Sequence, residues 1–86
     1  MSAGFEEIER LFSQLLAALQ PIFSEAEQQE VRHFIDVGEY GLALETLVGI
    51  FAEEKKECAP AVRLQIADLA GRMSIDPGPL LRSLRD

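Results

Sequence analysis

The sequence predicts an all-α protein, a small antiparallel four-helix bundle with a short C-terminal turn. Apolar residues recur every three or four positions along four successive segments, which is the spacing of one helix face. No segment alternates apolar and polar residues for long enough to predict a strand. The connections are short, and short connections favour antiparallel neighbours. The 86 residues are expected to form one domain, 1–86.

The first expected helix covers about residues 4–19. Glu6, Glu7 and Glu9 stand in its first turns, where the helix dipole favours negative charge. Pro21 ends the helix, because the residue before a proline is pushed out of the helical region. The apolar face of this helix is formed by Phe5, Ile8, Leu11, Phe12, Leu15, Leu16 and Leu19.

The second expected helix begins at Ser24 with the pattern of a capping box. The Ser24 hydroxyl can accept from the backbone N–H of Glu27, and the Glu27 carboxylate can accept from the N–H of Ser24. Gly38 suits the left-handed conformation found just past a helix end. The inward-facing residues are Val31, Phe34 and Ile35.

The third expected helix covers about residues 39–56. Gly41 and Gly49 interrupt it, and each costs about 1 kcal/mol relative to alanine. Such glycines indicate either close helix packing or the close approach of a partner, and packing is the favoured explanation. The apolar stripe of this helix is formed by Tyr40, Leu44, Leu47, Val48 and Phe51, and is widened by Ala43 and Leu42.

The fourth expected helix begins near Pro60, a residue that the first turn of a helix tolerates. The Asp-Pro-Gly-Pro stretch at 76–79 is expected to break the chain. Residues 80–84 are then left for one short terminal turn that covers the core. The inner face of the fourth helix is formed by Val62, Ile66, Leu69, Ala70 and Met73.

Acidic residues outnumber basic ones by fifteen to eight, which gives a net charge of −7. Residues 1–57 hold twelve acids and four bases, whereas residues 58–86 hold three acids and four bases. The negative field therefore belongs to the first two-thirds of the chain. This charge repels phosphate backbones, so we expect no nucleic-acid ligand and a basic partner instead.

Other classes of protein have little support in the sequence. One cysteine and one histidine, Cys58 and His33, can form neither an internal disulfide nor a zinc-type cluster, so we expect no metal and no cofactor. A catalytic Cys58–His33 pair would need the two side chains within hydrogen-bonding reach, and a structural role for both is favoured. A free thiol, a start unlike a signal peptide and the absence of a long apolar run predict a cytoplasmic protein without a membrane span.

Several acids lie where a helix does not favour them. Asp36 falls at the C-terminal end of the second helix, and Glu53 and Glu54 crowd the C-terminal end of the third, where the dipole disfavours anions. Glu45 projects from the side opposite the apolar stripe. Tyr40 lies between these acids, with a core role and a contact role equally open. As a group, the acids around the corner between the second and third helices are expected to bind a cationic ligand.

Residues 34–47 read Phe-Ile-Asp-Val-Gly-Glu-Tyr-Gly-Leu-Ala-Leu-Glu-Thr-Leu. This stretch resembles the central motif of the MafI-type immunity proteins, small cytoplasmic proteins that neutralise secreted polymorphic bacterial toxins. The resemblance implies an all-helical inhibitor with neither cofactor nor enzymatic activity. Its partner would be a toxin domain of a contact-dependent or related secretion system, frequently a nuclease that attacks RNA. The chain departs from the family pattern at 55–58. The motif positions that bear on binding are Asp36, Glu39, Tyr40 and Glu45.

The charge and the resemblance together predict an immunity protein that blocks a cognate toxin domain stoichiometrically. The toxin is expected to be a ribonuclease whose active site or substrate groove is covered. The alternative is a helical adaptor or structural bundle that self-associates through an apolar face, and a small enzyme is the third reading. The oligomeric state stays open. The expected partner-binding residues are Asp36, Glu39, Tyr40, Glu45, Glu53 and Glu54.

Overall fold

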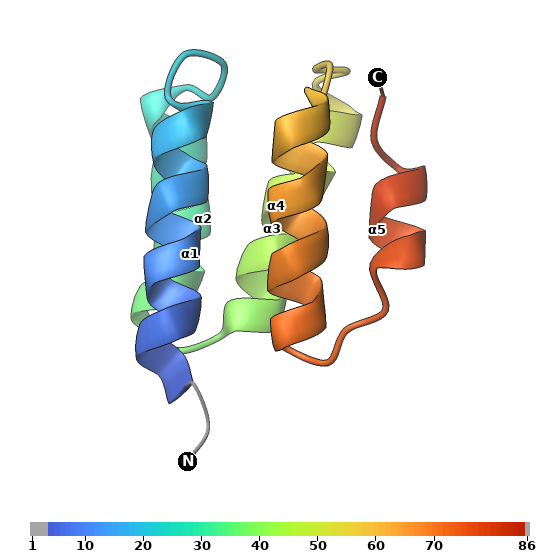
Figure 1. Cartoon of the computed structure of the whole chain (residues 1–86). Helices are drawn as coiled ribbons and strands as arrows, with labels where there is room; N and C mark the ends of the chain where they lie inside the picture. Colours follow the sequence, from blue (N-terminus) through green and yellow to red (C-terminus); the bar gives the residue numbers. More distant parts are fainter. Residues whose placement is uncertain (1–3, 86) are drawn as a thin grey trace.

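The structure, a computed structural model, describes residues 4–85. In this range five helices run up and down in alternation, with no named strand among them (Figure 1). The all-α prediction is therefore confirmed. The helices are α1 (Gly4–Leu19), α2 (Glu25–Asp36), α3 (Tyr40–Glu53), α4 (Pro60–Arg72) and α5 (Pro77–Arg82).

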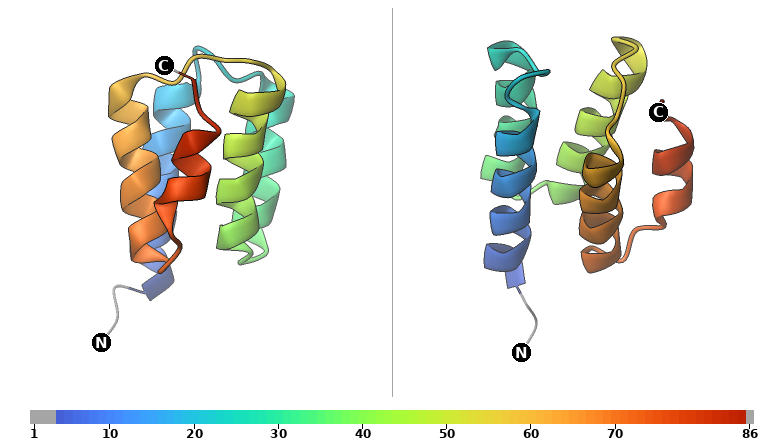
Figure 2. Two further views of the ribbon diagram at one scale, coloured as in Figure 1. Left: turned by 90° about the vertical axis from the view of Figure 1, so that its right-hand side faces the viewer. Right: turned by 45° about the horizontal axis from the view of Figure 1, so that its top comes forward.

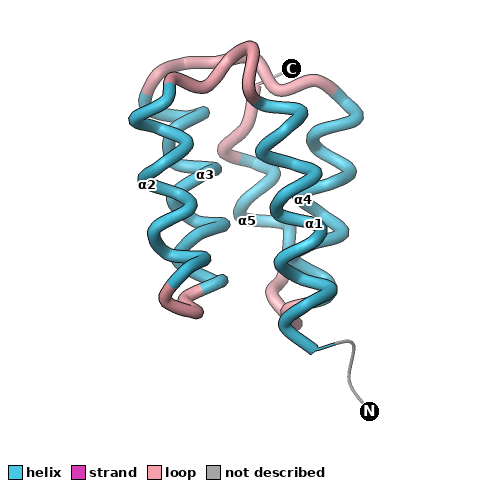
Figure 3. Tube along the Cα trace, turned by 90° about the vertical axis from the view of Figure 1, so that its left-hand side faces the viewer, coloured by secondary structure: helices cyan, strands magenta, loops and turns pink. Residues whose placement is uncertain are grey.

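The four long helices form two layers. Helix α1 packs against α4 in one layer, and α2 packs against α3 in the other (Figure 3). The core lies between the layers, and no polar or charged side chain among the described residues is buried in it. Its largest fully buried side chains are Phe12, Phe51, Leu15, Leu16, Leu19, Leu44, Leu47, Ile66 and Leu69.

The start of α2 has the predicted capping box. The Glu27 N–H donates to Ser24 Oγ over 3.1 Å, and the Ser24 N–H donates to Glu27 Oε1 over 2.9 Å. These bonds satisfy two backbone donors that have no partner inside the helix.

The short C-terminal helix begins earlier than the sequence predicts. Helix α5 begins at Pro77, inside the stretch that was expected to break the chain. A proline in the first turn loses no hydrogen bond, because the first N–H groups of a helix have no partner within it. Asp76 caps the start, since its Oδ1 accepts from the Gly78 N–H over 3.0 Å. The terminal turn expected at 80–84 is therefore the end of a helix that starts three residues earlier.

Helix α5 and the residues after it cover one side of the core. Helix α5 packs against α4 and lies in front of α4 and α3 when the bundle is viewed from that side (Figure 2, left). Leu84 is buried, and the Cys58 N–H donates to the Arg85 carbonyl over 2.8 Å. The chain after α5 is thereby tied to the connection between α3 and α4. The prediction that the C-terminal element covers the core is confirmed.

The end of α2 matches the prediction made for Gly38. This glycine has a φ of 80°, in the left-handed region. Its N–H donates to the Ile35 carbonyl over 3.0 Å, and the Glu39 N–H donates to the Phe34 carbonyl over 2.8 Å. These are the two hydrogen bonds of a Schellman motif, which turns the chain sharply from α2 into α3.

Helices α3 and α4 end with the same motif but without glycine. Lys55 and Ser74 have φ values of 54° and 59°. The N–H of the residue after each of them donates back into the helix, over 2.9 Å after α3 and 2.8 Å after α4. Helix α3 therefore stops at Glu53, three residues before the expected end at 56.

Within residues 4–85, no helix is both long and apolar enough to cross a membrane.

Candidate functional site

Three of the four acids of α1 and α4, namely Glu7, Glu9 and Asp68, have a side-chain partner, whereas Glu6 is exposed. Glu7 accepts from Arg10 over 2.6 Å and from Arg72 over 2.8 Å, and Asp68 accepts from Arg72 over 3.4 Å. The hydrogen bond from Arg10, with the positive charges of Arg10 and Arg72, holds the pKa of Glu7 below its usual value. These carboxylates join the start of α1 to the end of α4, so the fold itself uses them.

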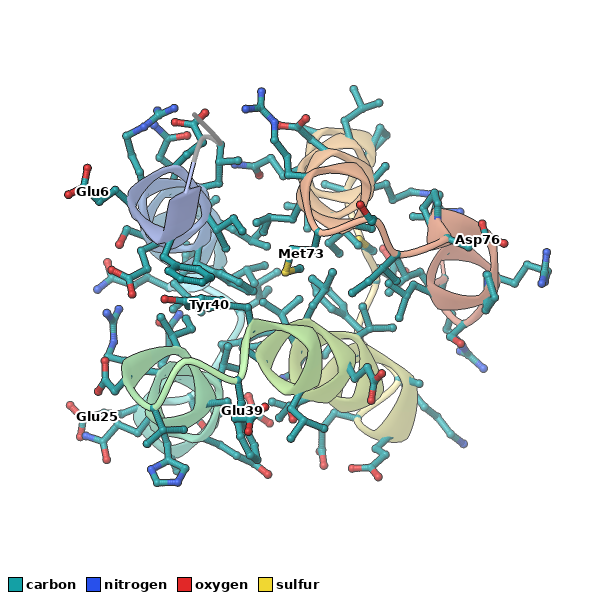
Figure 4. All side chains as sticks on the ribbon, turned by 90° about the horizontal axis from the view of Figure 1, so that it is seen from below. Glu6, Glu25, Glu39, Tyr40, Met73 and Asp76 are labelled. Atoms are coloured by element: carbon teal, nitrogen blue, oxygen red, sulfur yellow. The ribbon has the colours of Figure 1, made fainter. Side chains whose placement is uncertain are left out.

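Tyr40, the first residue of α3, is also used by the fold. Its hydroxyl donates to Glu9 Oε2 over 2.5 Å, and its ring centroid lies 5.5 Å from that of Phe5 and 6.4 Å from that of Phe12. The hydrogen bond to Glu9 raises the pKa of Tyr40, since it favours the protonated phenol. The side chain is half-buried and directed toward α1 (Figure 4). Tyr40 therefore fixes the start of α3 against α1, and its hydroxyl is occupied by Glu9.

The side of α3 that turns away from the core is open to solvent. Its residues recur at helical spacings of three and four, and Leu42, Glu45 and Glu53 are exposed while the others are partly exposed. Apart from Tyr40, only Glu45, Thr46 and Glu53 among the 14 residues of α3 have polar side chains. We call this surface the outer face of α3, formed by Leu42, Glu45, Thr46, Gly49 and Glu53.

A row of α2 residues adjoins the outer face of α3. Glu27 Oε1 lies 3.5 Å from Nζ of Lys56, just past the end of α3, so this side of α2 is turned toward α3. Glu30, Phe34 and Val37 follow Glu27 at spacings of three and four, which keeps them on the same side. Val37 is 59% exposed and Leu42, across the turn in α3, is 45% exposed. The prediction that Leu42 widens the buried stripe of α3 is therefore wrong, whereas Ala43 is buried as predicted. Glu30 is also exposed, and reasoning from the sequence missed it.

The six predicted residues do not form one cluster. Glu39 and Glu45 are exposed at the α2–α3 corner, and Figure 4 shows Glu39 on the side away from α1. Asp36 is nine residues after Glu27, about half a turn further round α2. It borders a shallow hollow with Gln29, Arg32 and His33, on a different side of the helix.

The other two predicted acids lie at the opposite end of α3. At 1.5 Å per residue, Glu53 is about 20 Å along the helix axis from Tyr40. Glu53 still belongs to the outer face of α3, whereas Glu54 lies past the helix end. The structure therefore brings Glu39, Glu45 and Glu53 onto one long surface and separates Asp36 and Tyr40 from it.

The acids of this surface differ from Glu7, Glu9 and Asp68 of the α1–α4 layer, which have partners. Among the described residues, no side chain forms an ion pair or a hydrogen bond with the carboxylates of Glu30, Glu39, Glu45 and Glu53. Two lysines follow the end of α3. Lys56 is engaged by Glu27 and lies over the Phe23 ring at 5.8 Å from its centroid, whereas Lys55 is exposed and forms no ion pair with these four carboxylates. The negative charge here is therefore not neutralised by the fold.

Gly41 and Gly49 were predicted to allow close helix packing, and the structure shows that this prediction is wrong. A Cβ atom at Gly49 would meet nothing within 4 Å, and one at Gly41 would lie 3.9 Å from Ile75 Cδ1, an ordinary van der Waals contact. Packing within the chain therefore requires glycine at neither position.

His33 and Cys58 are far apart in the bundle. His33 lies in the last turn of α2, is exposed, and has its ring 5.5 Å from the Phe34 ring. Cys58 is buried beyond the opposite end of α3. Within residues 4–85, no group of three or more histidine, cysteine or acidic residues could hold a metal ion.

No family model matches the chain, and neither the curated proteins nor the solved structures contain a match to it. The likeness of residues 34–47 to the MafI-type motif stays a prediction from the sequence.

Proposed function

We propose that the protein is a MafI-type immunity protein, which binds a cognate toxin domain and blocks its active site or substrate groove. The toxin domain is basic and cleaves RNA, and the complex contains one copy of each chain. The protein supplies an acidic, partly apolar surface and no catalytic group.

One observation carries this proposal. Three of the four acids of α1 and α4 are matched by arginines or by a tyrosine hydroxyl, whereas Glu39 and Glu45 stand unmatched beside the exposed Val37 and Leu42. A nuclease groove is basic because it binds phosphate, so this surface complements it. The acids would speed association and the apolar side chains would slow release.

Self-association is the second candidate, and the exposed Leu42 and Val37 favour it. Charge opposes it, however. If the α3 helices of two copies crossed antiparallel at Gly49, Glu45 of one copy would face Glu53 of the other, because both are four residues from the centre. Like charges at this position weaken such a dimer.

The test is an RNA-cleavage assay with the toxin domain encoded beside the gene of this protein. Cleavage should fall to background when the two proteins reach equal concentration, if both are well above the Kd. An unrelated helical protein with the same net charge is the control for non-specific neutralisation of a basic enzyme. Full cleavage at a saturating amount of the folded protein would refute the proposal.

Light scattering of the protein alone tests the second candidate. A monomer at all concentrations agrees with the immunity function. A dimer that forms with rising concentration, together with no effect on the toxin, would favour self-association.

A further inference from the structure

Most side chains of α3 are apolar, and the polar ones other than Tyr40, namely Glu45, Thr46 and Glu53, lie on its uncovered outer face. A helix this apolar is normally enclosed by its neighbours on most sides. Here α2 and the core cover the inner side, with Leu44, Leu47 and Phe51 almost fully buried. The outer face keeps Leu42 45% exposed and has open space above Gly49. An apolar side chain in the first turn of α3 and a bare stretch of backbone two turns further along are thus presented to solvent.

The fold gives no reason for glycine at position 49. Glycine is unfavourable inside a helix compared with alanine, and an alanine Cβ at this position would touch no other part of the described chain. Glycine has a use where another molecule must come close to the backbone. Gly71 of α4 is a useful comparison, because a Cβ there also meets nothing within 4 Å.

The surroundings of Gly49 carry one sign of charge. Glu45 and Glu53 lie one turn before and one turn after it on the same helix. Glu30 comes from the row of α2 that is turned toward α3. None of the three has a cationic partner among the described side chains. Leu42 and Gly49 on the outer face of α3 are therefore bordered by carboxylates that no cation neutralises.

We infer that the outer face of α3, centred on Gly49, is the docking surface for a basic protein partner. The partner places an apolar side chain or a backbone segment over Gly49, in contact with Leu42. Its lysine or arginine side chains lie over Glu45 and Glu53. This inference rests on the proposed function, and it places the contact along α3, away from Asp36 and Tyr40.

Charge complementarity selects this occupant over a second copy of the chain. The outer face of α3 bears an acid on each side of Gly49, so it complements a basic surface and repels its own duplicate. The affinity of the complex should therefore weaken as salt is raised, because exposed ion pairs are screened.

The first test compares matched glycine substitutions, with the toxin domain encoded beside the gene as the probe. Gly49→Ala and Gly71→Ala should each raise the Tm by about 4 °C, because both add a helix-favouring residue in open space. Only Gly49→Ala should weaken binding, by about tenfold, because its methyl group separates the two surfaces. Gly49→Leu should weaken binding by about a hundredfold, and Gly71→Leu should leave it unchanged.

The outcomes separate this inference from the proposed function. If the wild-type protein does not bind the toxin domain, the proposed function fails and this inference fails with it. If the wild type binds and the Gly49 variants bind equally well, the function stands and the outer face of α3 is not the contact. An affinity that is independent of salt would overturn the basic character of the partner surface. A wild-type dimer that Gly49→Leu converts to a monomer would assign the surface to self-association.

Discussion

The inner face of α3 is buried between the two layers, whereas its outer face is open to solvent. Both faces contain leucines only two residues apart in sequence. Leu44 is completely buried, and Leu42 is 45% exposed. The inner face meets the rest of the chain from Tyr40, which is bonded to α1, to Phe51, whose ring centroid lies 5.2 Å from that of Phe23. Within residues 4–85, no side-chain hydrogen bond or ring contact joins the outer face to another helix.

This difference separates the residues of α3 that stabilise the fold from those that remain accessible to a partner. Residues of the inner face are explained by burial, since removing apolar surface from water is the main source of stability in a small bundle. Residues of the outer face have no such explanation. A surface with exposed leucine, a glycine in open space and unmatched acids is therefore the part of α3 that a partner can use.

The largest expected effect comes from the two leucines. Leu44→Ala should lower the free energy of unfolding by about 2–5 kcal/mol, because it leaves a cavity in the core. Leu42→Ala should lower it by less than about 1 kcal/mol, since that side chain is only partly buried. Urea denaturation followed by circular dichroism at 222 nm measures both. Equal losses would show that the outer face also stabilises the fold.

The second effect concerns association with the toxin domain. Glu45→Lys combined with Glu53→Lys should lower the association rate about tenfold at low ionic strength, and the difference should shrink as salt is added. Glu6→Lys combined with Glu25→Lys gives the same change in net charge at the exposed first turns of α1 and α2. This control should slow association less. An equal effect of both pairs, measured by stopped-flow, would mean that only net charge matters.

The third effect concerns the point where both faces of α3 end. Lys55→Gly should raise the free energy of unfolding by about 0.5–1 kcal/mol, because glycine adopts a φ of 54° without steric strain. Gly38→Ala is the opposite control and should lower stability by about 1 kcal/mol, since its φ is 80°. Thermal denaturation of both variants measures the changes. A loss of stability in Lys55→Gly would show that the lysine side chain contributes more than its backbone strain costs.

The smallest effect is spectroscopic and reports on the inner face at the start of α3. Tyr40 is the single tyrosine of a chain without tryptophan, so the absorbance of its phenolate near 295 nm can be followed alone. The hydrogen bond to Glu9 raises its pKa, so ionisation should require a pH above the usual value of 10. The stability that this contact contributes is complete below pH 10 and is lost as the pH rises through the raised pKa. Glu9→Gln should return the titration toward 10, and an unchanged midpoint would contradict the contact.

The helices could be predicted from the sequence because their signals are local. The spacing of apolar residues marks each helix, Ser24 and Glu27 are three residues apart, and Gly38 directly follows its helix. The ends of α3 and α4 gave no such signal. Lys55 and Ser74 adopt the left-handed conformation of a Schellman motif, and neither residue type marks that conformation in a sequence as glycine does.

The candidate site was predicted in composition but not in arrangement. The acidic excess and Glu45 follow from counting and from helical spacing. The position of Asp36 relative to Glu39 could not be inferred, because the turn at Gly38 redirects the chain between them. The pairs that neutralise acids elsewhere are also invisible in sequence, since Glu9 and Tyr40 are 31 positions apart and Glu7 and Arg72 are 65 apart. Only the folded chain shows which carboxylates have partners.

The pairing of α1 with α4 has a consequence for the order in which the protein forms during translation. Helix α1 leaves the ribosome first, but its layer is incomplete until α4 has been synthesised. Helices α2 and α3 are consecutive, so their hairpin can close as soon as the end of α3 emerges. The α2–α3 hairpin can therefore cover part of the apolar side of α1, through Tyr40 and its ring contacts with Phe5 and Phe12, before residues 60–72 of α4 complete the cover.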